Sequence, residues 1–232
     1  MSSRLVALSF ESHDPAVMGA FWAGLLGREI VEEPGGVLLP GAGSQLGLRF
    51  VDGTTVKFGW NRLHLHVTTS SSDAQQEALE TVVRLGGRRR GTKPLPKDAD
   101  IFMADPDGNE FCLIEPGSAY YAGAGLLGDV TCDGGPEVGL FWRDALGWAL
   151  VWEEDDQTAI QSPAGGTKIS FDTWPDPPRS GRVRQRFDLA ASDPDAEAER
   201  LVSLGATRVR VDGAGRLILA DPGGDEFSLS RG

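Results

Sequence analysis

The chain has 232 residues, and its 34 acidic and 22 basic side chains give a formal net charge of −12. A surface with this excess of negative charge repels phosphate backbones and anionic lipid head groups, which argues against nucleic acid and membranes as partners. The N-terminal residues include no apolar signal segment, and no stretch has the length of a membrane span, so we expect a soluble, cytoplasmic protein. The two cysteines, Cys112 and Cys132, are too few for a disulfide framework, and we expect two reduced thiols.

The sequence contains an internal repeat. Residues 21–27, Phe-Trp-Ala-Gly-Leu-Leu-Gly, return as Phe-Trp-Arg-Asp-Ala-Leu-Gly at residues 141–147, and the Asp-Pro turn at residues 105–108 returns at residues 221–224. The offset is 120 residues at the first motif and 116 at the second. Offsets that drift by a few residues predict a duplicated unit with small loop insertions and deletions.

The repeat and the chain length together predict two homologous domains, residues 1–117 and 125–232, which we expect to pack together within the chain. The linker between them, residues 118–124, consists of small residues and two tyrosines. This composition predicts a connection that is flexible apart from the two tyrosines.

The first unit begins with an alternating strand at residues 4–11. A helix follows, with Asp14 as its N-cap, Pro15 in its first turn and Gly27 at its end. The remaining predicted elements of this unit are strands at 29–33, 36–39 and 45–51, a strand at 62–69, a helix at 72–85, and strands at 88–91, 100–104 and 110–115. The second unit is expected to follow the same plan, with strands at 129–132, 168–171, 184–190, 216–220 and 226–229 and helices at 137–146 and 195–204.

Each unit therefore contains two βαβββ modules, which places the fold in the α+β class. Consecutive, mostly antiparallel strands with one helix per module favour curled sheets around a cavity over a flat doubly wound sheet. A ferredoxin-like βαββαβ arrangement fits less well, because three strands follow each predicted helix.

Four motifs together resemble the vicinal oxygen chelate superfamily, which includes glyoxalase I, bleomycin-resistance proteins, fosfomycin-modifying transferases and extradiol dioxygenases. They are Phe-Trp-x-x-x-Leu-Gly after an Asp-Pro-capped helix, Asn-Arg-Leu-His-Leu at residues 61–65, a Leu-Gly pair after the second helix, and Asp-Pro-Asp-Gly-Asn-Glu-Phe-Cys-Leu at residues 105–113. The resemblance covers nearly the whole chain in two copies. It implies tandem glyoxalase-like domains, each with two modules forming a half-open barrel. In the metal-using members, His or Glu side chains from the first, fourth, fifth and eighth strands hold a divalent ion that polarises the substrate.

The resemblance also implies where such ligands would fall in the first unit: at Ala7, near Leu46 and Gly47, at His64 and at Cys112. One imidazole and one thiol are fewer than the three protein ligands that a catalytic metal normally needs. In the second unit, His64 aligns with Arg186. The expected cofactor is therefore none, with Zn, Ni, Mn or Fe as the open alternative.

His64 and His66 lie two residues apart on a predicted strand, so both rings point to one face. They are candidate catalytic residues, as a cavity-facing pair that transfers protons near neutral pH. Glu110 and Cys112 share a face of another strand by the same parity, and His64, Cys112 and Glu110 form the candidate metal set. The structural alternative is that the histidines lie on a solvated or core face and that the Glu110 carboxylate binds backbone amides of its turn.

The candidate ligand-binding residues are aromatic or basic. Trp60 and Trp174 lie in loops before the strands expected to carry the site, where an indole can stack on a planar ligand. Phe50 is a further aromatic candidate. Arg62 and Arg186 lie near the same mouth and are candidates to receive an anionic group, although both also fit solvated strand ends.

The ligand count favours a metal-independent protein that binds a natural-product-like or drug-like small molecule. Two alternatives stay open: a metal-dependent lyase, isomerase or dioxygenase acting on vicinal oxygens, and a metal-free enzyme with His64 or His66 as general base. The expected partners are a small-molecule ligand and the paired domains of the chain itself, with a homodimer left open.

Overall fold

The computed structural model describes residues 3–90, 100–173 and 183–232, which form four βαβββ modules. Module 1 comprises β1 (Arg4–Ser12), α1 (Pro15–Leu26), β2 (Val31–Glu33), β3 (Gly36–Leu39) and β4 (Gly47–Asp52). Module 2 comprises β5 (Leu63–Val67), α2 (Ser72–Arg84), β6 (Arg88–Arg89), β7 (Ile101–Ala104) and β8 (Glu110–Leu113). After the 3₁₀ helix η1 (Ala119–Tyr121), module 3 comprises β9 (Leu127–Asp133), α3 (Pro136–Leu146), β10 (Ala149–Glu154), β11 (Gln157–Gln161) and β12 (Lys168–Asp172). Module 4 comprises β13 (Gln185–Ala191), α4 (Pro194–Ser203), β14 (Thr207–Val211), β15 (Leu217–Ala220) and β16 (Glu226–Arg231).

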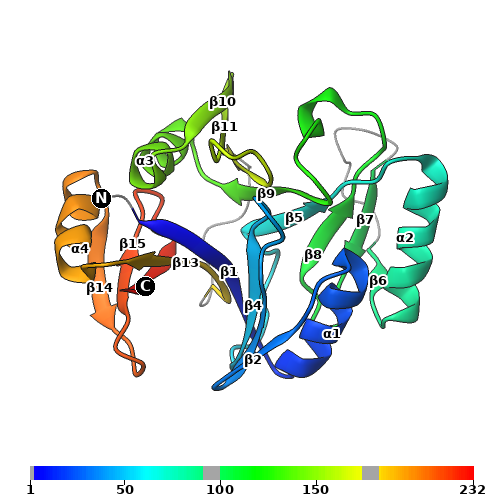
Figure 1. Cartoon of the computed structure of the whole chain (residues 1–232), viewed down its shortest axis with the longest axis horizontal. Helices are drawn as coiled ribbons and strands as arrows, with labels where there is room; N and C mark the ends of the chain where they lie inside the picture. The colour runs from blue at the N-terminus through cyan, green and yellow to red at the C-terminus, as the bar shows by residue number, and fades with distance from the viewer. Residues whose placement is uncertain (1–2, 91–99, 174–182) are drawn as a thin grey trace.

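The strands form two eight-stranded sheets, and each sheet takes one module from each half of the chain (Figure 1). Sheet A has the order β14-β15-β16-β13-β1-β4-β3-β2 and combines modules 1 and 4. Sheet B has the order β10-β11-β12-β9-β5-β8-β7-β6 and combines modules 2 and 3. The predicted α+β class with two βαβββ modules per unit is confirmed, and the sheets are shared between the two units.

Two antiparallel strand pairs make the connection between the halves. Strand β1 pairs with β13 in sheet A, and β5 pairs with β9 in sheet B. Within each module, by contrast, the first and last strands pair in parallel. The four strands at the centre of each sheet therefore come from both units, so a site on that part of the sheet needs both.

The first helix begins and ends as its sequence predicts. The carboxylate of Asp14 accepts a hydrogen bond from the Val17 amide, Pro15 occupies the first turn, and Gly27 closes the helix with a φ of 64°. Glycine suits this position because a side chain is strained in the left-handed region. None of the helices in the described parts of the chain is both long enough and apolar enough to cross a membrane.

The two repeated motifs contact each other in both copies. The indole Nε1 of Trp22 in α1 donates to Oδ2 of Asp105, 3.2 Å away, and Trp142 in α3 donates to Oδ2 of Asp221 at 3.0 Å. In each copy the helix belongs to one sheet and the Asp-Pro turn precedes a strand of the other. These hydrogen bonds therefore join the sheets through the single hydrophobic core that contains residues of both.

Aromatic rings surround each of these hydrogen bonds. The ring centroid of Trp22 lies 4.9 Å from that of Phe111, and the ring centroid of Trp142 lies 5.1 Å from that of Phe227, both edge to face. Because Asp105 is fully buried among such groups, desolvation raises its pKa to about 6, against the lowering effect of hydrogen bonds from Asn109 and Trp22.

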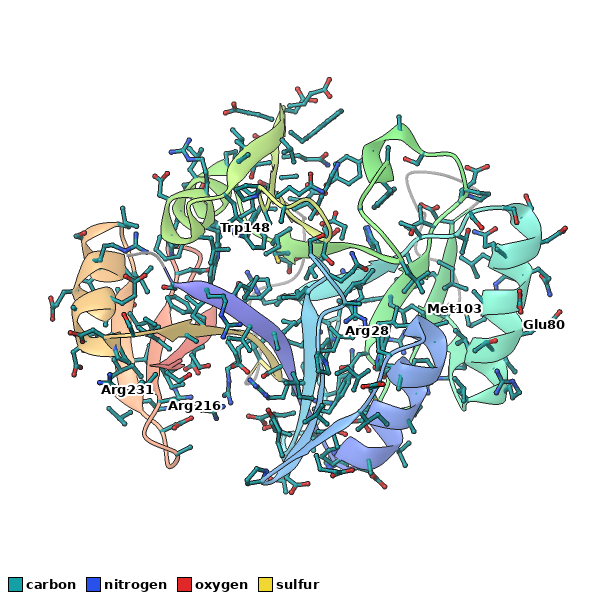
Figure 2. The ribbon with its side chains drawn as sticks, viewed as in Figure 1. Arg28, Glu80, Met103, Trp148, Arg216 and Arg231 are labelled. Carbon is teal, nitrogen blue, oxygen red and sulfur yellow. The ribbon has the colours of Figure 1, made fainter. Side chains whose placement is uncertain are left out.

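We predict that Trp22→Phe and Trp142→Phe each lower the free energy of unfolding by about 1–3 kcal/mol, because a buried carboxylate loses a hydrogen-bond donor while the aromatic packing is largely kept. Denaturant titration at neutral pH measures the change. Trp148→Phe is the matched control, since this half-buried residue lies just after α3 (Figure 2). An equal effect of all three substitutions would show that the indole N–H is not what matters.

The raised pKa of Asp105 predicts a pH dependence of stability. The stabilisation of the folded state by protonated Asp105 is fully present below pH 3.8, the pKa of the group in the unfolded chain. This stabilisation is lost as the pH rises through about 6, the pKa of the group in the folded chain. Asp105→Asn stays neutral and keeps an acceptor for Trp22, so the variant should gain on the order of 3 kcal/mol relative to the wild type between pH 4 and 7. Unfolding titrations across this pH range measure the difference, and Asp73→Asn is the control for the loss of one surface charge. Parallel plots of stability against pH for the wild type and Asp105→Asn would contradict the prediction.

Candidate functional site

Each sheet has a face that points away from the core, and we call these the open faces. Strand β5 shows the division: Leu63, Leu65 and Val67 are buried in the core, whereas His64 and His66 between them are half-buried on the other side. The sequence prediction that the two histidines share one face is confirmed by this alternation.

The centre of the open face of sheet B carries a cluster of polar side chains, which we call cluster B: His66, Cys112, Asp129 and Lys168. His66 on β5 lies in register with Cys112 on β8 and with Asp129 on β9, and Asp129 lies in register with Lys168 on β12. The predicted site residues His66 and Cys112 are therefore neighbours, and the cluster contains residues of both units.

Burial controls the charges in cluster B. Desolvation lowers the pKa of His66 although Asp129 and Asp100 act in the opposite direction, so the imidazole is held neutral. Desolvation raises the pKa of Asp129, whose Oδ2 accepts a hydrogen bond from Ser170 at 2.7 Å. Burial also lowers the pKa of Lys168, and the nearby Asp129 carboxylate counteracts this.

The linker covers cluster B. The hydroxyl oxygen of Tyr121 lies 2.8 Å from Nδ1 of His66, and the hydroxyl of Tyr120 donates to Oδ2 of Asp129 at 3.2 Å. The ammonium of Lys168 lies 4.1 Å above the Tyr120 ring and donates to the Tyr120 carbonyl. The two tyrosines, which the composition set apart from the small residues of the linker, thus contact the sheet through both their hydroxyl groups and the Tyr120 ring.

The open face of sheet A carries an equivalent group, cluster A: Ser9, Arg49, Asp188 and Ser228. The Asp188 carboxylate accepts hydrogen bonds from Ser9, from Arg49, and from Ser228 at 2.6 Å. Arg49 also forms an ion pair with Glu33 at 2.8 Å. Both oxygens of the buried carboxylate thus accept hydrogen bonds, and the guanidinium binds two acids.

Arg186, a predicted ligand-binding residue, lies beside cluster A on the same strand face as Asp188. Its Nε is buried, makes no hydrogen bond to the described residues and lies 3.8 Å from Oδ1 of Asp188. Burial and the neighbouring Arg216 lower its pKa, while Asp188 and Glu11 raise it. Charges of both signs therefore surround this guanidinium.

The internal repeat relates the two clusters. Ser9 and Arg49 in module 1 correspond to Asp129 and Lys168 in module 3, and both pairs lie in register on parallel strands. His66 and Cys112 in module 2 correspond likewise to Asp188 and Ser228 in module 4. Each cluster accordingly contains one aspartate and one basic side chain.

The donor sets of both clusters fit a divalent metal poorly. The resemblance places metal ligands on the four central strands, but in each cluster one of those strands presents a lysine or arginine, whose positive charge opposes a second cation. No group of three or more His, Cys, Asp or Glu side chains within the described ranges is placed to hold a metal ion. The four positions counted along the first unit alone, from Ala7 to Cys112, divide between the two sheets and do not converge.

Glu110 and Trp60 lie next to cluster B. The buried Glu110 carboxylate forms ion pairs with Lys57 at 2.7 Å and Arg90 at 3.2 Å and accepts from the Asn61 amide. The Trp60 ring stacks on Phe102 and lies 4.9 Å from the Arg90 guanidinium. This region brings together the predicted residues Trp60, His64, His66, Glu110 and Cys112.

The other predicted ligand-binding residues lie elsewhere. Arg62 forms an ion pair with Asp225 at 3.0 Å, which connects the two units. Phe50 is fully buried in the core and stacks on Phe10 at 5.3 Å. Trp174 lies outside the described residues.

A cavity of about 510 Å³ opens beside the linker. Its volume is in the range of small-molecule sites. It is bordered by Leu25 of α1, Glu77 of α2, the hydroxyl-bearing residues 68–70, and Tyr121 and Leu126. The Tyr121 side chain therefore separates cluster B from this cavity.

Sequence reasoning missed Asp129, Lys168, Arg49 and Asp188. It sought a complete ligand set within one unit, whereas each cluster combines strands of both. The available signal was the repeat itself, because a basic residue occurs at the same place in the fourth strand of modules 1 and 3.

The sequence profile of the glyoxalase-like domain family matches this chain twice, over residues 7–114 and 128–230. Glyoxalase I from Zea mays superposes with a TM-score of 0.69 at 16% sequence identity, over 99% of this chain and 92% of the maize chain. A putative dioxygenase from Bacillus subtilis superposes with a TM-score of 0.63 at 14% identity, over 99% of this chain and 85% of its own. At these identities the superpositions show a shared fold alone. A comparison with curated protein sequences gave no match.

We predict that Arg49→Met lowers the free energy of unfolding by on the order of 3 kcal/mol, because the buried Asp188 carboxylate loses the cation that is hydrogen-bonded to it. The double variant Arg49→Met/Asp188→Leu should recover part of this loss, since the buried carboxylate is removed together with its arginine. Arg143→Met is the control, because its ion pair with Asp144 is solvent-exposed and should matter little. Denaturant titration measures all three, and a single variant as stable as the wild type would contradict the prediction.

Proposed function

Since the chain belongs to the glyoxalase-like domain family of the vicinal oxygen chelate superfamily, we propose that it binds a small organic molecule without using a metal ion. The proposed site comprises the open face of sheet B around cluster B and the cavity beside the linker. The ligand is held there by aromatic and hydrogen-bonding side chains.

One observation carries the metal-independent part of this proposal: Lys168 and Arg49 occupy equivalent central-strand positions in the two clusters. A charged ammonium or guanidinium beside the aspartate supplies positive charge from the chain itself. A divalent ion at the same place would meet electrostatic repulsion and too few donors.

The binding part is supported by shape and by lining. The cavity of about 510 Å³ has the size of small-molecule sites and mixes apolar with hydroxyl-bearing residues. Behind Tyr121, a small apolar cluster of Phe102, Cys112 and Ile114 packs with Trp60 on the open face. Aromatic walls next to a few fixed polar groups are typical of sites for planar ligands.

A second candidate is a metal-free enzyme that uses His66 as a general base. The lowered pKa of His66 favours it, because a neutral imidazole is the form that accepts a proton. Turnover of a bound compound that is abolished by His66→Ala and kept by His64→Ala would select this candidate. Equal turnover by both variants would end it.

We predict that protein purified without chelators contains only substoichiometric Zn, Ni, Mn and Fe, because neither cluster offers a suitable donor set. Elemental analysis by mass spectrometry measures this, with melting temperatures before and after dialysis against EDTA as the second readout. A stoichiometric metal whose removal lowers the melting temperature would select the metal-dependent lyase, isomerase or dioxygenase instead.

We predict that a ligand found in a screen of planar natural-product-like compounds raises the melting temperature and changes tryptophan fluorescence. Trp60→Phe should remove most of the fluorescence change, because Trp60 is the indole that packs beside the proposed site. Trp148→Phe, after α3, should leave the change intact. If Trp148→Phe removed the fluorescence change and Trp60→Phe kept it, the ligand would bind elsewhere.

A further inference from the structure

We propose that the open face of sheet B is a binding site for phenols that the chain's own linker fills, so that an external phenol competes with Tyr120 and Tyr121 for it. This inference rests on the proposed small-molecule binding function and names the class of ligand. The occupant seen in the structure, two adjacent phenol side chains, indicates what the site accepts.

The site recognises the phenolic hydroxyl through fixed groups on two strands. His66 lies 2.8 Å from the Tyr121 oxygen, and Asp129 accepts the Tyr120 proton at 3.2 Å. A neutral imidazole and a buried carboxylate are strong acceptors for an O–H donor. A ring without a hydroxyl would deprive each of these two acceptors of one hydrogen bond inside the protein, which is unfavourable.

The site recognises the aromatic ring separately. The Lys168 ammonium lies 4.1 Å from the centre of the Tyr120 ring, a distance typical of cation–π contacts. Trp152 meets the same ring edge to face at 6.0 Å, and Tyr121 packs on the apolar cluster around Phe102. Hydroxyl and ring contacts together describe a pocket for a hydroxylated arene.

The linker satisfies this site incompletely. Oδ1 of Asp129 is buried and receives no hydrogen bond from the described residues, although Oδ2 receives two. A buried acceptor without a donor is unfavourable by roughly 1–3 kcal/mol in typical proteins. An external hydroxyl, free of the backbone constraints that position Tyr120, is able to approach this oxygen.

The linker contributes no strand to either sheet, so its displacement would leave the strand pairing intact. Its helix has only three residues and no side-chain cap, and glycines with positive φ flank it at Gly117, Gly123 and Gly125. Its far end is held by Gln45, which binds Ala124 and Leu127, and by Thr68, which binds Gly125 and Leu126. The cavity beside Tyr121 gives a ligand direct access to the displaced side chain's position.

The chain offers a specific probe for this exchange, because Tyr120 and Tyr121 are its only two tyrosines. Incorporation of 3-fluorotyrosine therefore gives fluorine NMR signals from the linker alone. Titration of the otherwise unaltered full-length protein with p-cresol should move both signals toward the shift of solvent-exposed fluorotyrosine. Toluene, which has the same ring and methyl group without the hydroxyl, is the matched control and should leave the signals in place.

Removal of the internal occupant should strengthen external binding. Tyr120→Ala/Tyr121→Ala should bind p-cresol roughly tenfold or more tightly than the wild type, because the external phenol no longer competes with a tethered one. Asp129→Asn in the same background should reverse much of the gain. Calorimetric titration measures the affinities, and the wild-type NMR experiment remains decisive if the double variant does not fold.

The outcomes separate this inference from the proposed function. Fluorotyrosine signals that stay fixed at saturating p-cresol, or p-cresol and toluene that bind equally, would overturn the phenol site. A different screened ligand that changes Trp60 fluorescence without moving those signals would overturn it as well, while leaving the proposed small-molecule binding function intact.

Discussion

The two antiparallel strand pairs between the repeats determine the rest of this structure. Because β1 pairs with β13 and β5 with β9, neither repeat forms an eight-stranded sheet by itself. The repeated Trp–Asp hydrogen bonds then join each half of one sheet to the other sheet through the core. The strand pairs thus connect the two halves of the chain, and the Trp–Asp hydrogen bonds connect the two modules within each half. Each open face combines strands from both halves.

The same pairing explains the chemistry of the clusters. Pairing brings the side chains of four strands into one small area, and in each cluster an aspartate lies there beside an arginine or a lysine. Burial makes such charges unfavourable unless they are paired or hydrogen-bonded. In cluster A the arginine and two serine hydroxyls satisfy the aspartate, whereas in cluster B the carboxylate depends on Ser170 and on the Tyr120 hydroxyl of the linker. The clusters therefore differ in the source of the hydrogen-bond donors: the sheet supplies them all in cluster A, whereas the sheet and the linker supply one hydroxyl each in cluster B.

Features encoded locally were predictable from the sequence. Short-range chemistry accounts for the N-cap at Asp14, the helix end at Gly27 and the Phe-Trp pair of α1. The internal repeat gave a second copy of the Phe-Trp motif and of the glycine that ends the helix. Strand partners were not predictable in the same way, because periodicity tells which residues share a face and not which strand lies alongside. That is why His64 and His66 were predicted to share one face, and Glu110 and Cys112 a face of another strand, while Asp129 and Lys168 from the other repeat were missed.

The linker shows a further limit of composition as a guide. Glycine and alanine at residues 118–124 predict mobility, yet a short segment is ordered wherever a few large side chains find partners, since each buried aromatic ring offsets several residues of backbone entropy. Both tyrosines of the chain fall inside this segment, and the groups that receive them, His66 and Asp129, are among the most strongly desolvated in the molecule. A tyrosine hydroxyl that hydrogen-bonds to such groups can be replaced by any other hydroxyl that approaches them with the same geometry. The buried acceptors His66 and Asp129 therefore explain two properties at once: they hold the tyrosines of the linker, and they give the open face of sheet B its affinity for phenols.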